Sequence, residues 1–222
     1  MRVVDVSPSG RLELPVGHGR LEALLKVPRS PRRAAVVLHG GGSTMNSGVV
    51  TRIARALAER DTAVLRFNFG GVGRSTGTFF ADGGVGEQQD TRAALDFMTV
   101  RYADLPLWLA GVSFGAWVGF KTAIADPRVK RLLGVGLPIR MAEFDLSFLE
   151  DKGRKPLAVV QGANDEYGPR SEIKAFLAGL PDPKRLWIVD GATHSFSGKL
   201  PAVEAAAAKA ITWLKRSGPS IR

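Results

Sequence analysis

Two serines stand in a Gly-x-Ser-x-Gly pattern, and only one of them has the surroundings that a nucleophile needs. Ser113 lies in the pattern at 111–115, between an apolar segment that predicts a strand and an apolar run that predicts a helix. A sharp strand-to-helix turn with small neighbours exposes a serine hydroxyl at the N-terminus of a helix. Ser75 is followed by glycines and polar residues that do not begin a helix at once, which indicates a turn or a pocket rim. Ser113 is therefore the candidate nucleophile.

A serine hydroxyl needs a neighbouring general base near neutral pH, and the chain has three histidines. His18 falls in a predicted hairpin turn, far from any expected strand end. His39 directly precedes glycines 40–42 and is better explained as support for that loop. His194 follows the last predicted strand, at the edge where parallel sheets carry their chemistry. We therefore expect His194 to be the base.

The base needs a carboxylate that holds its second nitrogen and stabilises the imidazolium. Asp165 follows the strand predicted at 156–161 and gives the chain order Ser, Asp, His. Glu166 is the first rival because it is adjacent, and Asp145 is the second because its loop follows the preceding strand. Asp190 better fits a turn. We expect Asp165 to be the acid.

Acyl transfer also needs two backbone N–H groups that face the oxygen as it becomes negatively charged. Phe114, the residue after the candidate nucleophile, is expected to provide one. The glycine-rich loop at 39–43 is expected to provide the second, from Gly41 or alternatively Gly42, because glycines let the main chain approach a substrate. Four residues are expected to bind substrate nearby: Gly42, Met45, Phe144 and Phe148. Each of the apolar ones fits the core equally well.

Segments that predict strands and helices alternate along almost the whole chain. Strands are expected near 11–14, 20–27, 34–38, 62–69, 107–112, 132–137, 156–161 and 185–189. Helices are expected near 48–60, 87–101, 114–125, 170–180 and 201–216. This order favours an α/β fold in which a mostly parallel sheet of about eight strands is covered by helices on both faces.

The ends of this pattern define its organisation. The first two strands flank Pro15, Gly17 and Gly19 and predict an antiparallel opening hairpin. We find no repeat, linker or low-complexity segment, so we expect one domain over 1–222. The short segment between Leu137 and Pro156 leaves little or no room for a cap.

Composition limits the partners. Hydrophobic residues make up 45% of the 222 residues and charged residues 23%, which is typical of a globular protein. The lack of cysteine excludes disulfides and thiolate chemistry and fits a reducing compartment. The basic residues behind the net charge of +10 are spread along the chain, without a nucleic-acid motif or an aromatic-interleaved basic strand.

The sequence also lacks the patterns of membrane and nucleotide-binding segments. No apolar run suits a signal peptide or a membrane span. The glycine-rich run at 70–77 lacks the spacing of a phosphate loop or a dinucleotide motif. We therefore expect a cytoplasmic protein with no nucleic-acid or membrane partner, no cofactor and no metal. A homodimer is left open.

Four motifs, taken together and in this order, resemble small bacterial α/β-hydrolases of the dienelactone-hydrolase and serine-aminopeptidase-like kind. The motifs lie at 66–77, 109–116, 161–165 and 191–200. The resemblance covers about 34–214 and implies an α/β-hydrolase fold. It places Ser113, Asp165 and His194 at the triad positions, and Gly41 and Phe114 at the oxyanion positions.

The chain departs from that group at two places. His39 is followed by three glycines where the group often has His-Pro-His-Pro, and Gly70 stands where the group often has arginine. The first departure concerns the second oxyanion donor and the second concerns the pocket rim.

These expectations combine into a hypothesis of function. Ser113 attacks a small or short-chain ester, His194 moves the proton, and water releases the acid, which makes the protein a serine hydrolase and a carboxylesterase. A peptidase or amidase would use the same triad. A lactone hydrolase of the dienelactone type would suit the basic surface if its substrates are anionic. A non-catalytic binding protein on this fold is the remaining rival.

Overall fold

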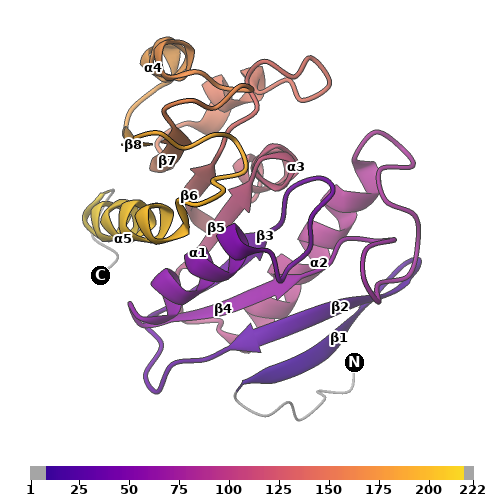
Figure 1. Cartoon of the computed structure of the whole chain (residues 1–222). Coiled ribbons are helices and arrows are strands. Elements are labelled where there is room, and N and C mark those ends of the chain that lie inside the picture. The colour runs from indigo at the N-terminus through magenta and orange to yellow at the C-terminus, as the bar shows by residue number, and fades with distance from the viewer. Residues whose placement is uncertain (1–8, 218–222) are drawn as a thin grey trace.

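The computed structural model describes residues 9–217, and its centre is a single eight-stranded sheet (Figure 1). The strands lie in the order β1-β2-β4-β3-β5-β6-β7-β8. Their bounds are β1 (Gly10–Val16), β2 (Gly19–Lys26), β3 (Arg33–Leu38), β4 (Thr62–Phe67), β5 (Leu107–Val112), β6 (Val129–Val135), β7 (Leu157–Gly162) and β8 (Lys184–Val189). The pairs β1–β2 and β2–β4 are antiparallel and the other pairs are parallel. The expected sheet with an antiparallel opening hairpin is confirmed.

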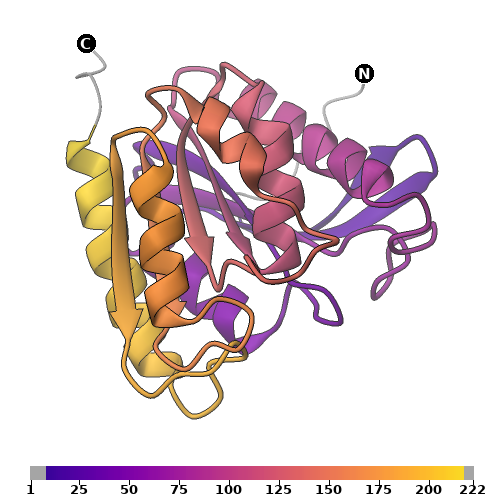
Figure 2. The ribbon, with the colours of Figure 1, turned by 90° about the horizontal axis from the view of Figure 1, so that it is seen from above.

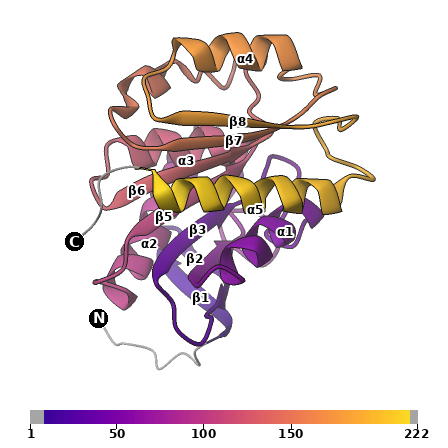
Figure 3. The same ribbon diagram turned by 90° about the vertical axis from the view of Figure 1, so that its left-hand side faces the viewer.

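Helices cover both faces of this sheet, as expected (Figures 2 and 3). They are α1 (Gly48–Ala58), α2 (Val85–Arg101), α3 (Phe114–Ile124), α4 (Arg170–Gly179) and α5 (Leu200–Arg216), with the 3-10 helix η1 (Ser147–Lys152). One buried cluster joins the sheet to α2, α3 and α4, and a second joins it to α1 and α5. None of the described helices is both long and apolar enough to cross a bilayer.

The central strand β3 shows why the sheet needs cover on both sides. All six of its residues are buried. Ala34, Val36 and Leu38 belong to the cluster with α2 and α3, whereas Ala35 and Val37 belong to the cluster with α1 and α5. Successive side chains of a strand point to opposite faces, so a continuous apolar run specifies a strand that is buried twice.

The end of β6 differs from the expectation in a way that matters for the site. The strand expected at 132–137 ends at Val135, because Gly136 has a φ of +63° and turns the chain out of the sheet. A side chain at Gly136 would contact the imidazole of His194, so this turn also brings the chain close to the candidate base.

The segment between β6 and β7 forms no cap domain. It contains only turns and η1, and the buried Leu149 of η1 packs into the cluster with α3. The carboxyl ends of the central strands are therefore covered by loops alone, as the short segment predicts.

Candidate active site

Ser113 occupies a sharp turn between β5 and α3. Its backbone has φ +49° and ψ −117°, a conformation that residues with side chains rarely adopt. A methyl group at Gly111 would overlap the Gly115 carbonyl, and one at Gly115 would overlap the His39 carbonyl. The two glycines of the motif are therefore required by close packing of strand, helix and loop. The turn presents the Ser113 hydroxyl at the N-terminus of α3.

The hydroxyl of Ser113 meets the imidazole of His194. The Oγ–Nε2 distance is 2.8 Å, and the opposite nitrogen, Nδ1, lies 3.0 Å from both carboxylate oxygens of Asp165. An ionised carboxylate only accepts hydrogen bonds, so Nδ1 carries the proton and Nε2 accepts from Ser113. The structure thus brings the three predicted residues together in an arrangement that can pass a proton from the hydroxyl to the imidazole.

Asp165 is held by residues that the sequence reasoning missed. Its side chain is buried, and it accepts hydrogen bonds from Gln161 Nε2 at 2.8 Å and from the Tyr167 N–H at 2.9 Å. Gln161 is itself buried and accepts the Leu137 N–H at 2.8 Å. The Tyr167 ring also packs edge-on against the imidazole of His194, with ring centroids 4.8 Å apart. The sequence signals for Gln161 are its place at the start of the motif at 161–165 and its polar character at the end of an apolar strand.

The two rival acids make other contacts. Glu166 accepts the backbone N–H of His194 at 3.1 Å, so it contacts the loop rather than the ring. Asp145 accepts both the N–H and the hydroxyl of Ser147, at 2.9 and 2.8 Å. Asp165, by contrast, accepts from Nδ1 of the imidazole with both of its oxygens.

His39 supports the glycine-rich loop, as its position suggested. The ring is fully buried; its Nε2 lies 3.2 Å from the Phe69 N–H, and its Nδ1 lies 2.8 Å from the Gly40 carbonyl. Nε2 therefore accepts and Nδ1 donates. Burial lowers the pKa of His39, which keeps the ring neutral. The Gly40 carbonyl and the Gly41 N–H belong to one planar peptide unit and point in opposite directions, so His39 sets the direction of the Gly41 N–H.

Gly41 and Phe114 lie against each other at the turn that carries Ser113. A Cβ at Gly40 would be 3.5 Å from Ser113 Cβ, and one at Gly41 would be 3.7 Å from Phe114 Cβ. The Phe114 N–H is in the first turn of α3, where N–H groups have no partner within the helix. Gly42 has a φ of +63°, and a Cβ added there would have no neighbour within 4 Å. Of the two candidate glycine donors, Gly41 thus lies against the turn at Ser113.

A cleft of about 510 Å³ opens at these residues. It is lined by Gly40, Gly41, Ser43, Ser47, Gly48, Val49, Val112, Ser113, His194, Ser195, Ser197, Gly198 and Leu200. Small and hydroxyl-bearing residues predominate, and no arginine, lysine, aspartate or glutamate is among them. The cleft therefore suits a small, uncharged group.

The residues expected to bind substrate lie elsewhere. Gly42 does not line the cleft, and Met45 is buried beneath the loop, where its N–H donates to Asn68 Oδ1 at 2.8 Å. Phe144 packs on Trp117 with ring centroids 5.1 Å apart, and Phe148 packs against the core. Met45 is thus buried, whereas Phe144 and Phe148 are half-buried against the core and outside the lining of this cleft.

Ser75 and His18 have structural contacts. The hydroxyl of Ser75 donates to the Asn68 carbonyl at 2.6 Å and accepts the Glu22 N–H at 2.9 Å, which attaches the turn after β4 to β2. His18 Nε2 lies 2.8 Å from the carboxylate of Asp90 in α2. Within residues 9–217, no three His, Asp or Glu side chains gather closely enough to hold a metal ion.

The chain belongs to the α/β-hydrolase family, since residues 31–212 match the model of an alpha/beta hydrolase domain. An uncharacterized protein from Rickettsia prowazekii is 32% identical over 193 residues, which are 82% of this chain and 80% of that protein. This family confirms the resemblance and the fold class inferred from the sequence.

Solved structures with this fold include two bacterial serine hydrolases. An alpha-beta serine hydrolase homologue from Coxiella burnetii is 31% identical with a TM-score of 0.82, and the match covers 93% of this chain and 99% of that one. A serine hydrolase without lid from Xanthomonas campestris is 29% identical with a TM-score of 0.84, covering 98% and 100%. These matches support hydrolase activity for this protein.

Proposed function

We propose that this protein is a carboxylesterase that cleaves small, uncharged esters through an acyl-enzyme intermediate on Ser113. The observation that carries the proposal is the continuous contact from Ser113 Oγ through the His194 ring to the buried carboxylate of Asp165. Membership of a hydrolase family and the similarity to serine hydrolases support it.

The contacts define a complete cycle. As Ser113 Oγ attacks the ester carbonyl, its proton moves to His194 Nε2, and Asp165 stabilises the imidazolium. The N–H groups of Gly41 and Phe114 bind the oxygen that becomes negative, which lowers the barrier by about 3–4 kcal/mol per donor in comparable enzymes. The imidazolium then gives its proton to the departing alcohol. A water molecule, deprotonated by His194, attacks the acyl carbon, releases the acid and restores the serine.

The cleft supports a short and uncharged substrate. Its apolar surface comes from Val49, Val112 and Leu200. A methyl group at Gly48 would lie 2.7 Å from Leu200 Cδ1, so these two residues already touch and narrow the cleft. No cation lines the cleft to bind a carboxylate, which disfavours the anionic lactones considered from the sequence.

A fluorophosphonate label and a panel of substrates test this function. We expect the label to react with the wild type and not with Ser113→Ala, and turnover of p-nitrophenyl butyrate to fall by about 10⁶ in that variant. Ser75→Ala is the matched control, because it removes the serine of the other Gly-x-Ser-x-Gly copy. It should keep turnover within about twofold.

The panel compares acetyl, butyryl and octanoyl p-nitrophenyl esters with a butyryl anilide and a small neutral lactone. We expect the highest kcat/KM for the two shorter esters. Undiminished labelling or turnover in Ser113→Ala would falsify the proposed nucleophile. Preference for the anilide or the lactone would replace the esterase by an amidase or a lactone hydrolase.

A further inference from the structure

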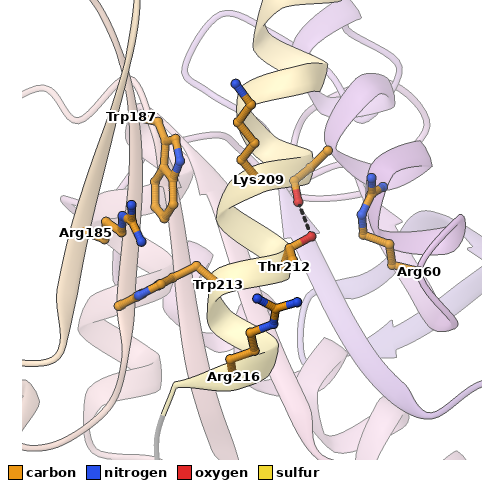
Figure 4. A pocket seen from close by; sticks show the side chains of 8 residues that line it. Arg60, Arg185, Trp187, Lys209, Thr212, Trp213 and Arg216 are labelled. Atoms are coloured by element: carbon orange, nitrogen blue, oxygen red, sulfur yellow. Dashed lines mark hydrogen bonds between the residues drawn. The ribbon is translucent and has the colours of Figure 1, made fainter.

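A second pocket, of about 400 Å³, lies over the C-terminal half of α5, with β8 on one side and Arg60, just after α1, on the other (Figure 4). The residues that line it are Arg60, Arg185, Trp187, Ala208, Lys209, Thr212, Trp213 and Arg216. Arg185 and Trp187 are two apart on β8 and therefore share one face of the strand. Lys209, Trp213 and Arg216 repeat at helical spacing on α5. Strand and helix thus direct their basic and aromatic side chains into one space.

Two indole rings form the aromatic part of this pocket. The centroids of Trp187 and Trp213 are 5.9 Å apart, and their planes are inclined by 64°. The guanidinium carbon of Arg185 lies 5.3 Å from the centroid of Trp187. Both indoles remain partly exposed, so a flat ring can reach them. The sequence shows no aromatic-interleaved basic strand, because half of this combination comes from α5.

The charge of the pocket is uncompensated. Four of its lining residues are cationic and none is acidic. Among residues 9–217, no carboxylate lies within ion-pair distance of Arg185, Lys209 or Arg216. Nearer the start of α5 the positive charge is compensated, because Glu204 of α5 forms ion pairs with Arg52 and Arg55 of α1. The cations of the pocket therefore lack the partner that the neighbouring arginines have.

Helix dipoles account for only part of this charge. A cation in the last turn is favoured by the negative end of a helix dipole, which explains Arg216, and Arg60 Nη1 donates to the Ala56 carbonyl near the end of α1. Arg185 lies on a strand and Lys209 lies in the middle of α5. Their convergence on two indoles needs another explanation.

We propose that this pocket binds a small anion that carries a flat aromatic ring. Guanidinium groups bind phosphate or carboxylate through paired N–H donors, and they stack on aromatic planes. Indole faces stack on planar rings, and a cavity of this size is typical of small-molecule sites. Nucleotides and aryl carboxylates share the required chemistry.

This site is separate from the cleft at Ser113. Leu200, at the start of α5, lines the cleft, whereas Arg216, at the end of the same helix, lines the pocket. A helix rises about 1.5 Å per residue, which puts these two residues about 24 Å apart along the axis. The inference therefore holds whether or not the chain is an esterase.

Isothermal titration calorimetry on the full chain tests the proposal with three ligands: AMP, benzoate and inorganic phosphate. We expect AMP, benzoate or both to bind saturably with one site per chain, and phosphate alone to bind at least about tenfold more weakly. Binding of AMP alone identifies a nucleotide site, and binding of benzoate alone identifies an aryl-carboxylate site. If neither ligand saturates the protein below about 5 mM, the proposal is overturned. If phosphate binds as tightly as AMP, the proposed role of the indoles is overturned.

Variants separate the pocket from the general positive charge. Arg185→Ala/Arg216→Ala should weaken binding at least about tenfold, because two of the four cations that line the pocket are lost. Arg29→Ala/Arg154→Ala removes the same charge from exposed positions outside the pocket and should change the Kd less than about twofold. Equal effects of the two double variants, or none from the first, contradict the site.

Trp213→Leu probes stacking, with circular dichroism as the check of folding. This variant should weaken the binding of AMP or benzoate and leave the Kd of phosphate unchanged. Should that variant not fold, the two arginine variants decide alone, since Arg185 and Arg216 are exposed. Ester turnover serves as a second check and should be unchanged by the arginine variants.

Discussion

Two histidine–aspartate pairs lie within residues 9–217, and their local geometry is similar. His194 Nδ1 lies 3.0 Å from Asp165, and His18 Nε2 lies 2.8 Å from Asp90. Both aspartates are almost fully buried, and each also accepts one backbone N–H, at 2.9 and 2.8 Å respectively. A buried carboxylate that holds an imidazole therefore does not by itself mark a reactive site.

The difference lies at the second ring nitrogen. His194 Nε2 reaches the hydroxyl of Ser113, whereas His18 Nδ1 faces Gly77, where an added Cβ would be only 2.9 Å away. The first pair follows the carboxyl ends of β7 and β8, beside the turn after β5. The second joins the opening hairpin to α2. One arrangement has a serine hydroxyl within reach, and the other attaches an edge of the sheet to a helix.

The largest difference is expected when each histidine is removed. His194→Ala should lower the turnover of p-nitrophenyl butyrate by about 10⁶, because the base is lost. His18→Ala should keep turnover within about twofold and lower the free energy of unfolding by about 1–3 kcal/mol, since Asp90 stays buried with one partner fewer. Ester hydrolysis and urea unfolding measure the two effects. A large loss of turnover in His18→Ala would show that the pairs are not functionally distinct.

The aspartates should differ by a smaller factor. Asp165→Asn should lower kcat by about 10⁴, because an amide can donate to Nδ1 and favours the wrong tautomer of His194. Asp90→Asn is the matched control and should leave kcat within about twofold. Steady-state kinetics with one ester and the rate of fluorophosphonate labelling measure the loss. Retention of wild-type labelling by Asp165→Asn would count against Asp165 as the acid.

His39 gives a third and smaller contrast, because it is a buried histidine without a carboxylate. Burial lowers its pKa below the ordinary 6.5, so unfolding takes up a proton as the pH falls below that value. The contribution of the neutral ring to stability is thus complete above about pH 6.5 and declines toward the folded pKa, by at most about 1.4 kcal/mol per pH unit. As the pH falls from about 6.5 to 5, the free energy of unfolding should decrease less steeply in His39→Gln than in the wild type.

Urea unfolding at several pH values in that range measures the slope for the wild type and the variant. The variant is expected to be less stable near neutral pH, because a buried hydrogen bond is changed, so the slope and not the stability is the test. Parallel pH dependence in the two proteins would mean that His39 does not couple folding to protons.

The three members of the candidate site could be named from the sequence for local reasons. The strand before Ser113 and the helix after it are encoded by neighbouring residues, and so is the sharp turn between them. Parallel strands place the loops with Asp165 and His194 at the same edge of the sheet. Glu166 could not be rejected in this way, because adjacent residues share a loop and only its fold shows which carboxylate turns toward the ring.

Alternation of apolar segments, glycines at turns and the order of the elements by themselves determined the fold class and the place of the candidate site, because these signals act within a few residues. Contacts across long stretches of chain were decided only by the tertiary structure. Gln161 beneath Asp165, the burial of Met45 and the meeting of Arg185 with Trp213 all depend on how strands and helices pack. An apolar side chain fits core or cleft equally well, and a charged one fits cleft or surface, until its neighbours are in place.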